Sequence, residues 1–507
     1  MNSDPGMKKL DAGALGRLPP EVRLPNYSPQ AAGLGVVHLG VGNFFRAHQA
    51  AYLDDAMNHG ATGWGICGVS LRSPQTRDAL LPQAGYYTLV ERDAGSDRAR
   101  IIGSLRELLV ATEDPAKVIS RLAADATHWV TLTITEKGYS QLSDGVSGRL
   151  DHAHPEIAHD LVNPRTPRSA VGLLHAGVMQ RRRSSAGPLT VLSCDNLSRN
   201  GELLRALLLE FDAAVGGGSS DWIEAELQFP NSMVDRIVPR TTDAERILAR
   251  RLLGCDDAWP VVTEAFSQWV IEDRFAGPRP PIEHHGVELV ADVRPYEAMK
   301  LRLLNAAHSA LAWLAVPAGL STVDQAIAQP EIRDFVQALW REEVIPGLDI
   351  DMIGAAPAYC ASLLERFANP GLAHQTAQIA MDGSQKLPLR ILPSIRANLA
   401  QGLPIDHLAL TVAAWIRYLG GIDEQARPFK PDDPWLERLQ KSAARSDSFE
   451  AAESIIAQRA IFGELADSKT LQHAVGQRLA NLRRAGTRRT LTLLVTERLR
   501  EARRASH

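Results

Sequence analysis

The stretch that decides the fold is Gly35-Val-Val-His-Leu-Gly-Val-Gly-Asn-Phe-Phe-Arg46. Its apolar first half predicts a short buried strand, and the segment after Gly42 has the pattern of a helix. A Gly-x-Gly turn between a strand and a helix can present backbone N–H groups to a pyrophosphate. The third glycine of the usual Gly-x-Gly-x-x-Gly pattern is replaced by Phe45. On the motif alone, a tight turn that binds nothing therefore remains an equal alternative.

Strand-like and helical segments alternate after this stretch, as they do in an α/β domain. The expected strands are Trp64–Ser70, Tyr86–Glu91, Arg100–Leu105, His128–Thr135, Pro188–Cys194, Phe266–Glu272 and Gly286–Ala291. Two of them, Tyr86–Glu91 and Arg100–Leu105, have the spacing of a hairpin-like insertion. From Tyr296 onward the pattern is almost entirely helical. We therefore predict an α/β Rossmann-type dinucleotide-binding domain over residues 1–291, followed by a mostly α-helical domain over residues 292–507.

Polar residues follow two of the expected strands, with Glu136 and Lys137 after the first and Asp195 and Asn196 after the second. Ligands gather at the carboxyl ends of strands in open α/β sheets. These four residues are therefore candidates for a site, although polar residues also end strands merely to form a turn.

The residues after the strand Trp64–Ser70 bear on the choice of dinucleotide. An acidic residue at the end of the second strand would bond the adenosine ribose and select NAD. Here the first acid is Asp78, and Arg72 could instead meet a 2′-phosphate. The residues alone leave NAD and NADP open.

The segment Pro295–His308 predicts a helix in which Met299, Leu303, Ala306 and Ala310 face a core. The other side then carries Glu297, Lys300, Asn305 and His308 within an arc of about 140°. A lysine with a lowered pKa can serve as a general base, an amide can donate to a developing alkoxide, and a neutral histidine can orient a hydroxyl. Such a set suits proton removal from a secondary alcohol; a buried helix with an incidental lysine and histidine is the alternative.

The overall composition is that of an ordinary globular protein, with 507 residues, a net charge of −4 and 45% hydrophobic residues. This charge favours neither nucleic acid nor an anionic membrane as a partner. The four cysteines, Cys67, Cys194, Cys255 and Cys360, form no C-x-x-C pair. We expect a cytoplasmic protein with no membrane span, no disulfide framework and no zinc cluster.

Five motifs occur together in one order: Gly40-Val-Gly-Asn-Phe-Phe-Arg-Ala-His48, Thr135-Glu-Lys-Gly-Tyr139, Cys194-Asp-Asn-Leu197, Phe229-Pro-Asn-Ser-Met-Val-Asp-Arg236 and Lys300-x4-Asn305-x2-His308. The set resembles the mannitol dehydrogenase family of polyol-specific long-chain dehydrogenases, from about residue 35 to about residue 470. The resemblance also accounts for Phe45, because the glycine turn of that family ends in a bulky residue.

The resemblance implies a metal-independent, NAD-linked oxidoreductase, with NADP not excluded, that acts on a small polyol or sugar acid as a monomer or weak homo-oligomer. It implies that Lys300 is the general base, that Asn196 and Asn305 hold the alkoxide, and that His308 orients the substrate. It further implies substrate contacts for Asp235 and Lys386 and a proton relay through Glu297. The expected cofactor contacts are Val37, Gly40, Val41, Gly42, Asn43, Phe44, Arg46, Arg72, Glu136 and Asn196.

Two substrate classes remain. Mannitol-type members tend to carry an arginine before the Asp-Gly-Ser loop, where this chain has His374-Gln-Thr-Ala-Gln-Ile-Ala380. The run Ile379–Pro388 is closer to the fructuronate reductase branch, and Lys386 or Arg390 could bind a carboxylate. We therefore favour D-mannonate/D-fructuronate, with D-mannitol/D-fructose or another hexitol or pentitol as the alternative.

Two further readings stand beside a dehydrogenase. One is a catalytically silent dinucleotide sensor, which would need the glycine turn but not Lys300, Asn305 and His308. The other is an oxidative decarboxylase of a phosphorylated sugar acid, which would need a clustered phosphate-binding set that this sequence does not reveal.

Overall fold

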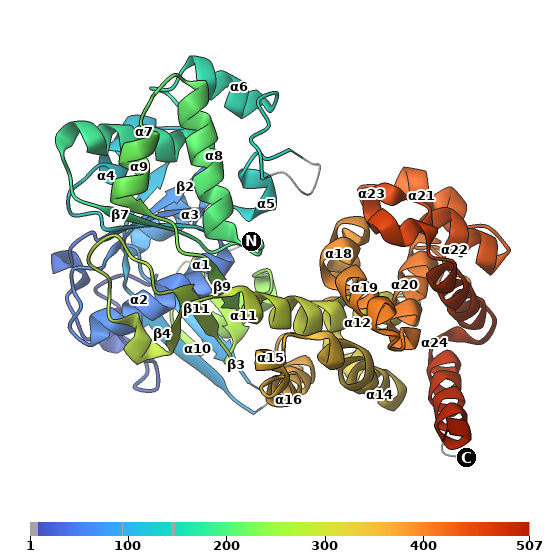
Figure 1. Ribbon diagram of the computed structural model, residues 1–507. Coiled ribbons are helices and arrows are strands. Elements are labelled where there is room, and N and C mark those ends of the chain that lie inside the picture. The colour runs from blue at the N-terminus through green and yellow to red at the C-terminus, as the bar shows by residue number, and fades with distance from the viewer. Residues whose placement is uncertain (1–8, 94, 143–147, 506–507) are drawn as a thin grey trace. The chain divides into compact units, whose positions relative to one another are not determined.

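The computed structural model describes residues 9–93, 95–142 and 148–505 (Figure 1). The chain forms two compact units, of which the first ends at Arg294 and the second begins at Pro295. The first contains a parallel sheet with helices and the second is helical, so the predicted fold class is confirmed.

A six-stranded, all-parallel sheet forms the centre of the first unit. Its strands, in spatial order, are β5 (Leu105–Val110), β2 (Ile66–Ser70), β1 (Val36–Leu39), β6 (Trp129–Leu132), β7 (Leu189–Ser193) and β8 (Leu227–Gln228). β1, β2, β6 and β7 are buried along their whole length, as strands covered on both faces must be. The chain runs from β1 to β2 on one side and later to β6 on the other. This reversal is a topological switch point, where α/β proteins bind ligands.

Helices cover both faces of this sheet. The α-helices described in the first unit are α1 (Asn43–Ala47), α2 (Gln49–Asn58), α3 (Gln75–Leu80), α4 (Pro115–Leu122), α5 (Thr135–Gly138), α6 (Pro155–Val162), α7 (Ala170–Ser184), α8 (Asn200–Ala214), α9 (Ser220–Glu226) and α10 (Asp243–Leu253), of which α10 packs on a separate, three-stranded sheet. Val37 and Leu39 of β1 pack into a core with residues of α4, α7 and α8. The alternate residue Val36 packs into a second core with residues of α1 and α2.

Two three-stranded sheets complete the first unit: β10 (Val261–Glu264), β3 (Tyr87–Arg92) and β4 (Asp97–Ile102), and β12 (Val287–Val290), β11 (Gln268–Glu272) and β9 (Ser232–Asp235). β3 and β4 pair antiparallel, as the predicted hairpin requires. The sequence prediction missed β5, β8, β9 and β10. In β5 the partly exposed Arg106 and Glu107 interrupt the apolar run, and β9 follows directly after Pro230 and Asn231, which read as a turn.

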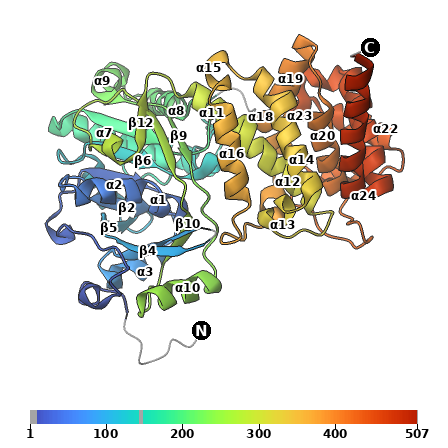
Figure 2. The ribbon, with the colours of Figure 1, turned by 90° about the horizontal axis from the view of Figure 1, so that it is seen from below.

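The second unit is helical throughout its described residues, apart from turns and connecting loops. Its helices are α11 (Arg294–Met299), the π-helix η5 (Lys300–Asn305), α12 (Ala306–Ala315), α13 (Val323–Ile327), α14 (Pro330–Ala338), the π-helix η6 (Leu339–Val344), α15 (Ile350–Ile353), α16 (Ala356–Phe367), α17 (Thr376–Ala380), α18 (Gly383–Arg390), α19 (Leu392–Gln401), α20 (Asp406–Leu419), α21 (Leu436–Ala443), α22 (Ser448–Ile456), α23 (Arg459–Phe462) and α24 (Lys469–Ala505). α24 packs against α20 and α22 (Figure 2). Within the described residues, no helix is long and apolar enough to cross a membrane.

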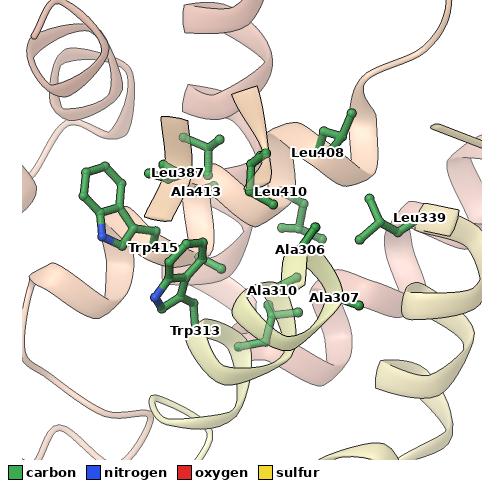
Figure 3. Packing of buried hydrophobic residues seen from close by; sticks show 14 of the residues in the cluster. Ala306, Ala307, Ala310, Trp313, Leu339, Leu387, Leu408, Leu410, Ala413 and Trp415 are labelled. Carbon is green, nitrogen blue, oxygen red and sulfur yellow. The ribbon is translucent and has the colours of Figure 1, made fainter. Parts of the chain in front are cut away.

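α12 and α20 form the middle of the second unit, and every residue of α12 is buried. Ala306, Ala307 and Ala310 present small side chains, which let neighbouring helices approach closely (Figure 3). Trp313 of the same helix fills the space beside Trp415 of α20, with ring centroids 6.4 Å apart. The helix that carries His308 therefore belongs to the rigid core.

Candidate active site

The candidate residues fall into two groups, one in each unit, and each group is described within its own unit. In the first unit the group lies at the carboxyl ends of β1, β6 and β7, beside the switch point. In the second unit it lies on α11, η5, α12 and α18.

The glycine turn after β1 has the backbone that a dinucleotide site needs. Gly40 has φ +101°, and a Cβ atom there would lie 2.1 Å from the Thr133 carbonyl oxygen, so only glycine fits. Gly42 is exposed, and a Cβ atom there would meet only the Gly40 carbonyl oxygen, at 3.9 Å, among the described atoms. α1 begins directly after Gly42, and no described side chain caps it. Because the first N–H groups of a helix lack partners within it, these residues fit a pyrophosphate.

His38 explains why Phe45 can stand where other glycine turns have a third glycine. The His38 and Phe45 rings stack with centroids 3.5 Å apart. His38 Nδ1 bonds the Thr131 hydroxyl at 2.7 Å, and its Nε2 lies 3.1 Å from the Gly40 carbonyl oxygen. Burial lowers the pKa of His38 to about 3, so the ring is neutral. The stacked His38 and Phe45 rings therefore pack against the glycine turn and support its backbone.

Several of the expected cofactor residues support the turn from inside. Val37 and Arg46 are each 1% exposed. The Arg46 guanidinium donates to the Asn43 side chain at 2.7 Å and to the Trp259 carbonyl, and it lies over the Tyr87 ring. In this structure Arg46 thus holds α1 against β10 and β3. The helix predicted over Gly42–Leu53 is interrupted at His48, where α1 ends and α2 begins.

The remaining expected cofactor residues of the glycine turn and of the segment after β2 differ in their exposure to solvent. Val41 is buried, whereas Asn43 and Phe44 are partly exposed. Arg72, after β2, is exposed and pairs with Glu156 at 3.0 Å. Its charge is therefore already engaged in an ion pair that a 2′-phosphate would have to replace.

Asp195 ties the ends of β6 and β7 together. Its carboxylate accepts hydrogen bonds from Ile134 N, Thr135 N and the Tyr139 hydroxyl, all at 2.9 Å. Thr135 has φ 64°, a strained conformation for a β-branched residue, so these bonds hold a turn that would otherwise relax. Glu136 follows Thr135 and Asn196 follows Asp195 in the sequence, and both side chains are exposed. Asp195 therefore positions the two expected ligand-facing residues relative to each other.

Asp235 lies at the carboxyl end of β9 and is 3% exposed. Its neighbour Arg236 donates to the Glu264 and Ala47 carbonyls and to Glu91, which anchors the end of the strand. The expected substrate contact of Asp235 remains a prediction.

The helix predicted over Pro295–His308 is not regular, and this corrects the sequence interpretation. Lys300–Asn305 is a π-helix between α11 and α12. A π-helix bonds residue i to residue i+5, whereas the prediction spaced residues at the α-helical 100°. Lys300 and Asn305 are five residues apart and would lie about 140° apart on an α-helix. In the π-helix they are one turn apart and lie on one side. Met299, Leu303, Ala306 and Ala310 are all buried, as predicted.

The widened turn of η5 needs outside donors for its carbonyl groups. Trp340 of η6 donates its Nε1–H to the Leu303 carbonyl at 2.9 Å, and Arg390 lies 3.5 Å from the Asn305 carbonyl. Arg302 extends from η5 to the Gly347 carbonyl at 2.8 Å. These contacts with η6, with the 3₁₀-helix η7 (Ile345–Gly347) and with α18 stabilise a backbone form that is rare overall but frequent at functional sites.

The ionisable groups on and around η5 are shielded from solvent. Glu297, Lys300 and His308 are 7%, 8% and 6% exposed, and Asn305 is partly exposed. Burial lowers the pKa of His308 well below its ordinary value, and the charges of nearby basic residues add to the effect. His308 is therefore a neutral ring that can both donate and accept a hydrogen bond.

Lys386 is brought to His308 by the close approach of α18 to the core. A Cβ atom on Gly383 would lie 2.1 Å from Trp415 Nε1, so a glycine is needed where α18 begins. Lys386 Nζ donates to the Ile379 carbonyl at 3.0 Å. Its charge lowers the pKa of both His308 and His374. The Lys386 ammonium therefore lies close enough to His308 and His374 to affect both rings, and its expected substrate contact remains a prediction.

Sequence reasoning missed three parts of this site: the π-helix, the Trp340 donor and the contact of His308 with Phe367 and His374. His308 stacks on Phe367 at 4.6 Å and meets the His374 ring edge-on at 5.3 Å. No spacing within the sequence signals these contacts, because they join residues from four separate segments. Among the described residues, no group of three or more histidine, cysteine, aspartate or glutamate side chains could hold a metal ion.

Comparisons with known proteins agree with this arrangement. Residues 34–284 match the mannitol dehydrogenase Rossmann domain, and residues 292–483 match the mannitol dehydrogenase C-terminal domain. The chain belongs to the mannitol dehydrogenase family. The resemblance stated from the five motifs is thereby confirmed.

Relatives within the mannitol dehydrogenase family are similar over nearly the whole chain. Mannitol 2-dehydrogenase of Phaeosphaeria nodorum is 40% identical over 96% of this chain and 86% of the relative. The enzyme of Pyricularia oryzae is 39% identical over 94% and 96%, respectively. Among solved structures, the ternary complex of Pseudomonas fluorescens mannitol 2-dehydrogenase with NAD and D-mannitol has a TM-score of 0.87 at 38% identity, and covers 96% of this chain and 99% of its own. A substrate-free D-sorbitol dehydrogenase has a TM-score of 0.86 at 32% identity, with 95% and 100% covered.

Proposed function

We propose that this protein is a mannitol 2-dehydrogenase, which interconverts D-mannitol and D-fructose with NAD as hydride carrier. The observation that carries the proposal is the similarity of about 40% over almost the full length to enzymes of that activity. The likeness to the complex with NAD and D-mannitol supports the same substrate and cofactor. At the coarser level, the chain is a NAD-dependent secondary-alcohol dehydrogenase of polyols.

The residues present support a division of roles. NAD, when bound, accepts the hydride from the alcohol carbon. The glycine turn at Gly40 and Gly42 binds its pyrophosphate through backbone N–H groups. Lys300 accepts the hydroxyl proton, a role that requires the neutral amine. Glu297, one helical turn before Lys300, passes the proton to solvent.

The amides and the neutral imidazole hold the reacting oxygen. Asn196 follows Asp195 at the end of β7, and Asn305 lies one π-helical turn from Lys300. Both donate to the developing alkoxide, as in an oxyanion hole. His308 bonds a substrate hydroxyl and fixes the orientation of the chain, with Asp235 and Lys386 as further substrate ligands.

The sequence interpretation had preferred D-mannonate/D-fructuronate, on the run Ile379–Pro388. The relatives favour the alternative instead, because those at about 40% identity are mannitol 2-dehydrogenases.

All four cysteines are free and buried, which supports the expectation of a reducing compartment such as the cytoplasm. A monomer or weak homo-oligomer stays a prediction.

The purified protein should be assayed with NADH and NADPH against D-fructose, D-fructuronate, D-tagaturonate and D-xylulose, and with NAD against D-mannitol and D-sorbitol. We expect the highest kcat/KM with D-fructose and NADH. Turnover of D-fructuronate alone would restore the sugar-acid assignment. Turnover of none of these substrates, with dinucleotide binding intact, would identify a cofactor sensor.

A further inference from the structure

His308, which is buried, and His374, which is partly buried, differ from the other buried histidines that the structure describes. His38, His48, His175 and His407 all form side-chain hydrogen bonds within the protein. In the part of the chain that the structure describes, neither His308 nor His374 forms one. His308 Nε2 and His374 Nδ1 are both enclosed and have no hydrogen-bond partner there. A buried polar atom without a partner costs about 1–3 kcal/mol, so two in contact call for an explanation.

The two rings lie against each other in a defined geometry. Their centroids are 5.3 Å apart and their planes are inclined at 81°, so the edge of one ring meets the face of the other. Phe367 stacks on His308 at 4.6 Å with an inclination of 22°. His308 is thereby fixed between an aromatic face and a second imidazole. His374 is only partly buried, so a ligand that reaches this pair can contact it.

The backbone holds His374 in place at a local cost. Ala373, the residue before it, has φ 43°, a left-handed conformation that non-glycine residues seldom adopt. The His374 carbonyl accepts from Val323 N at 3.0 Å, and Thr376 N donates to the Ser321 carbonyl at 3.0 Å. These two backbone hydrogen bonds hold the chain around His374 against the residues at the start of α13. Strain that the surroundings maintain in this way is common at ligand sites.

The neutral state of the two rings bears on the kind of ligand that they can bind. Burial lowers the pKa of His374 to about 4, and Lys386 adds to the shift. His374, Arg366, Arg390 and Lys386 all lower the pKa of His308, after burial itself. At neutral pH both rings are therefore uncharged, with one donor and one acceptor nitrogen each. A hydroxyl group, which also both donates and accepts, complements such a ring; a carboxylate or phosphate would gain more from the protonated form.

We propose that His374 is a second substrate ligand, which forms with His308 a two-imidazole site for neighbouring hydroxyl groups of the polyol and so determines which polyols are accepted. The proposal rests on the proposed polyol dehydrogenase function. It deepens that function by assigning substrate selection to a residue outside the five motifs that identify the family. The hydroxyls concerned lie along the carbon chain from the reacting alcohol, so their loss should affect substrate binding more than the chemical step.

The test is a set of substitutions measured in the full-length protein. His374→Phe keeps an aromatic ring beside His308 and removes both nitrogens. We expect the KM for D-mannitol to rise about tenfold, which corresponds to about 1.4 kcal/mol, with kcat within about twofold of wild type and the Kd for NADH unchanged. The ratio of kcat/KM values between hexitols and pentitols should change by a similar factor. His374→Asn, whose amide can replace Nδ1, should recover part of the KM.

His473→Phe is the matched control. His473 is an exposed histidine that packs on Phe449 of α22, and its replacement should leave every KM unchanged. An unchanged KM for all polyols in His374→Phe would overturn the proposal. So would a joint fall of kcat and thermal stability that His374→Asn does not recover, because His374 would then only pack against His308.

The wild-type assay separates this proposal from the proposed function. If wild type reduces D-fructuronate rather than D-fructose, the mannitol assignment fails, and the variants are compared on D-fructuronate. If wild type turns over no substrate, the function fails, and calorimetric titration of D-mannitol into wild type and His374→Phe decides. Equal affinity, or no binding to either, then rejects a hydroxyl-binding role for His374.

Discussion

At the scale of single residues, Lys300 is the group on which the proposed chemistry depends. It is 8% exposed and lies at the first position of η5, one turn of π-helix from Asn305. A lysine can act as a general acid–base when its surroundings lower its pKa toward neutrality, and Lys300 is enclosed within the second unit. Tyr139 and Asp195 do not react; they hold the turn that carries Glu136 and Asn196.

Lys300→Ala should lower kcat for D-mannitol oxidation by about two to four orders of magnitude, because a general acid–base contributes about that much. NADH binding should remain near wild type, since the glycine turn lies in the other unit. Stopped-flow kinetics and fluorescence titration with NADH measure the two effects. Lys441→Ala, at an exposed position on α21, is the control. Wild-type turnover in Lys300→Ala would show that another residue is the base.

At the scale of elements, the π-helix η5 decides the geometry of the reactive residues. A regular α-helix would separate Lys300 and Asn305 by about 140°, whereas the π-helix places them one turn apart. The Leu303 carbonyl in the widened turn accepts from Trp340, which belongs to the second π-helix, η6. The two irregular helices therefore support each other through a buried side-chain-to-backbone hydrogen bond.

Trp340→Phe should lower kcat about tenfold, because the loss of this donor lets η5 relax and moves Lys300 relative to Asn305. The free energy of unfolding should fall by about 1–3 kcal/mol. Trp313→Phe is the matched control: Trp313 is also buried and donates to a carbonyl, that of Ala380, at 3.0 Å. Urea unfolding and steady-state kinetics are measured for both. Equal losses of kcat in the two variants would mean that η5 has no special dependence on Trp340.

At the scale of the whole molecule, dinucleotide binding is linked to global stability. A ligand that binds only the folded protein stabilises it, by about 2.7 kcal/mol at a hundredfold excess over its Kd. Substitutions at Gly40 and Gly42 should distinguish an effect on folding from an effect on dinucleotide binding. The first is surrounded by backbone and the second faces open space.

Gly42→Val should change the free energy of unfolding by about 0.5 kcal/mol or less without ligand, because its side chain meets no close neighbour. It should abolish most of the stabilisation by NADH, because the side chain would occupy the approach of the pyrophosphate. Gly40→Ala should instead cost about 1–3 kcal/mol without ligand, through its positive φ and the Thr133 carbonyl. Denaturant unfolding with and without NADH measures both variants. Full stabilisation of Gly42→Val by NADH would place the dinucleotide elsewhere.

The sequence by itself determined the order of the fold and the identity of the candidate groups. Both could be predicted from local patterns, because apolar strands, the glycine turn and helical periodicity each depend on residues that are close together in the sequence. The sequence did not predict the π-helix, because the stretch Lys300–Asn305 has the composition of an ordinary helix. Its Leu303 carbonyl accepts a hydrogen bond from Trp340, which is distant in the chain. The strand β5 was missed for a similar reason: its burial comes from pairing with β2 and not from its own alternation.

Only the tertiary structure decided how the candidate groups are supported. It placed Asp195 across the ends of two strands, folded Arg46 inward beneath the glycine turn, and set His374 against His308. Sequence periodicity reports which face of an element is buried, but not which distant residue meets it there. Contacts between elements depend on packing and on hydrogen bonds that close over long stretches of chain, so they exist only once the core has formed.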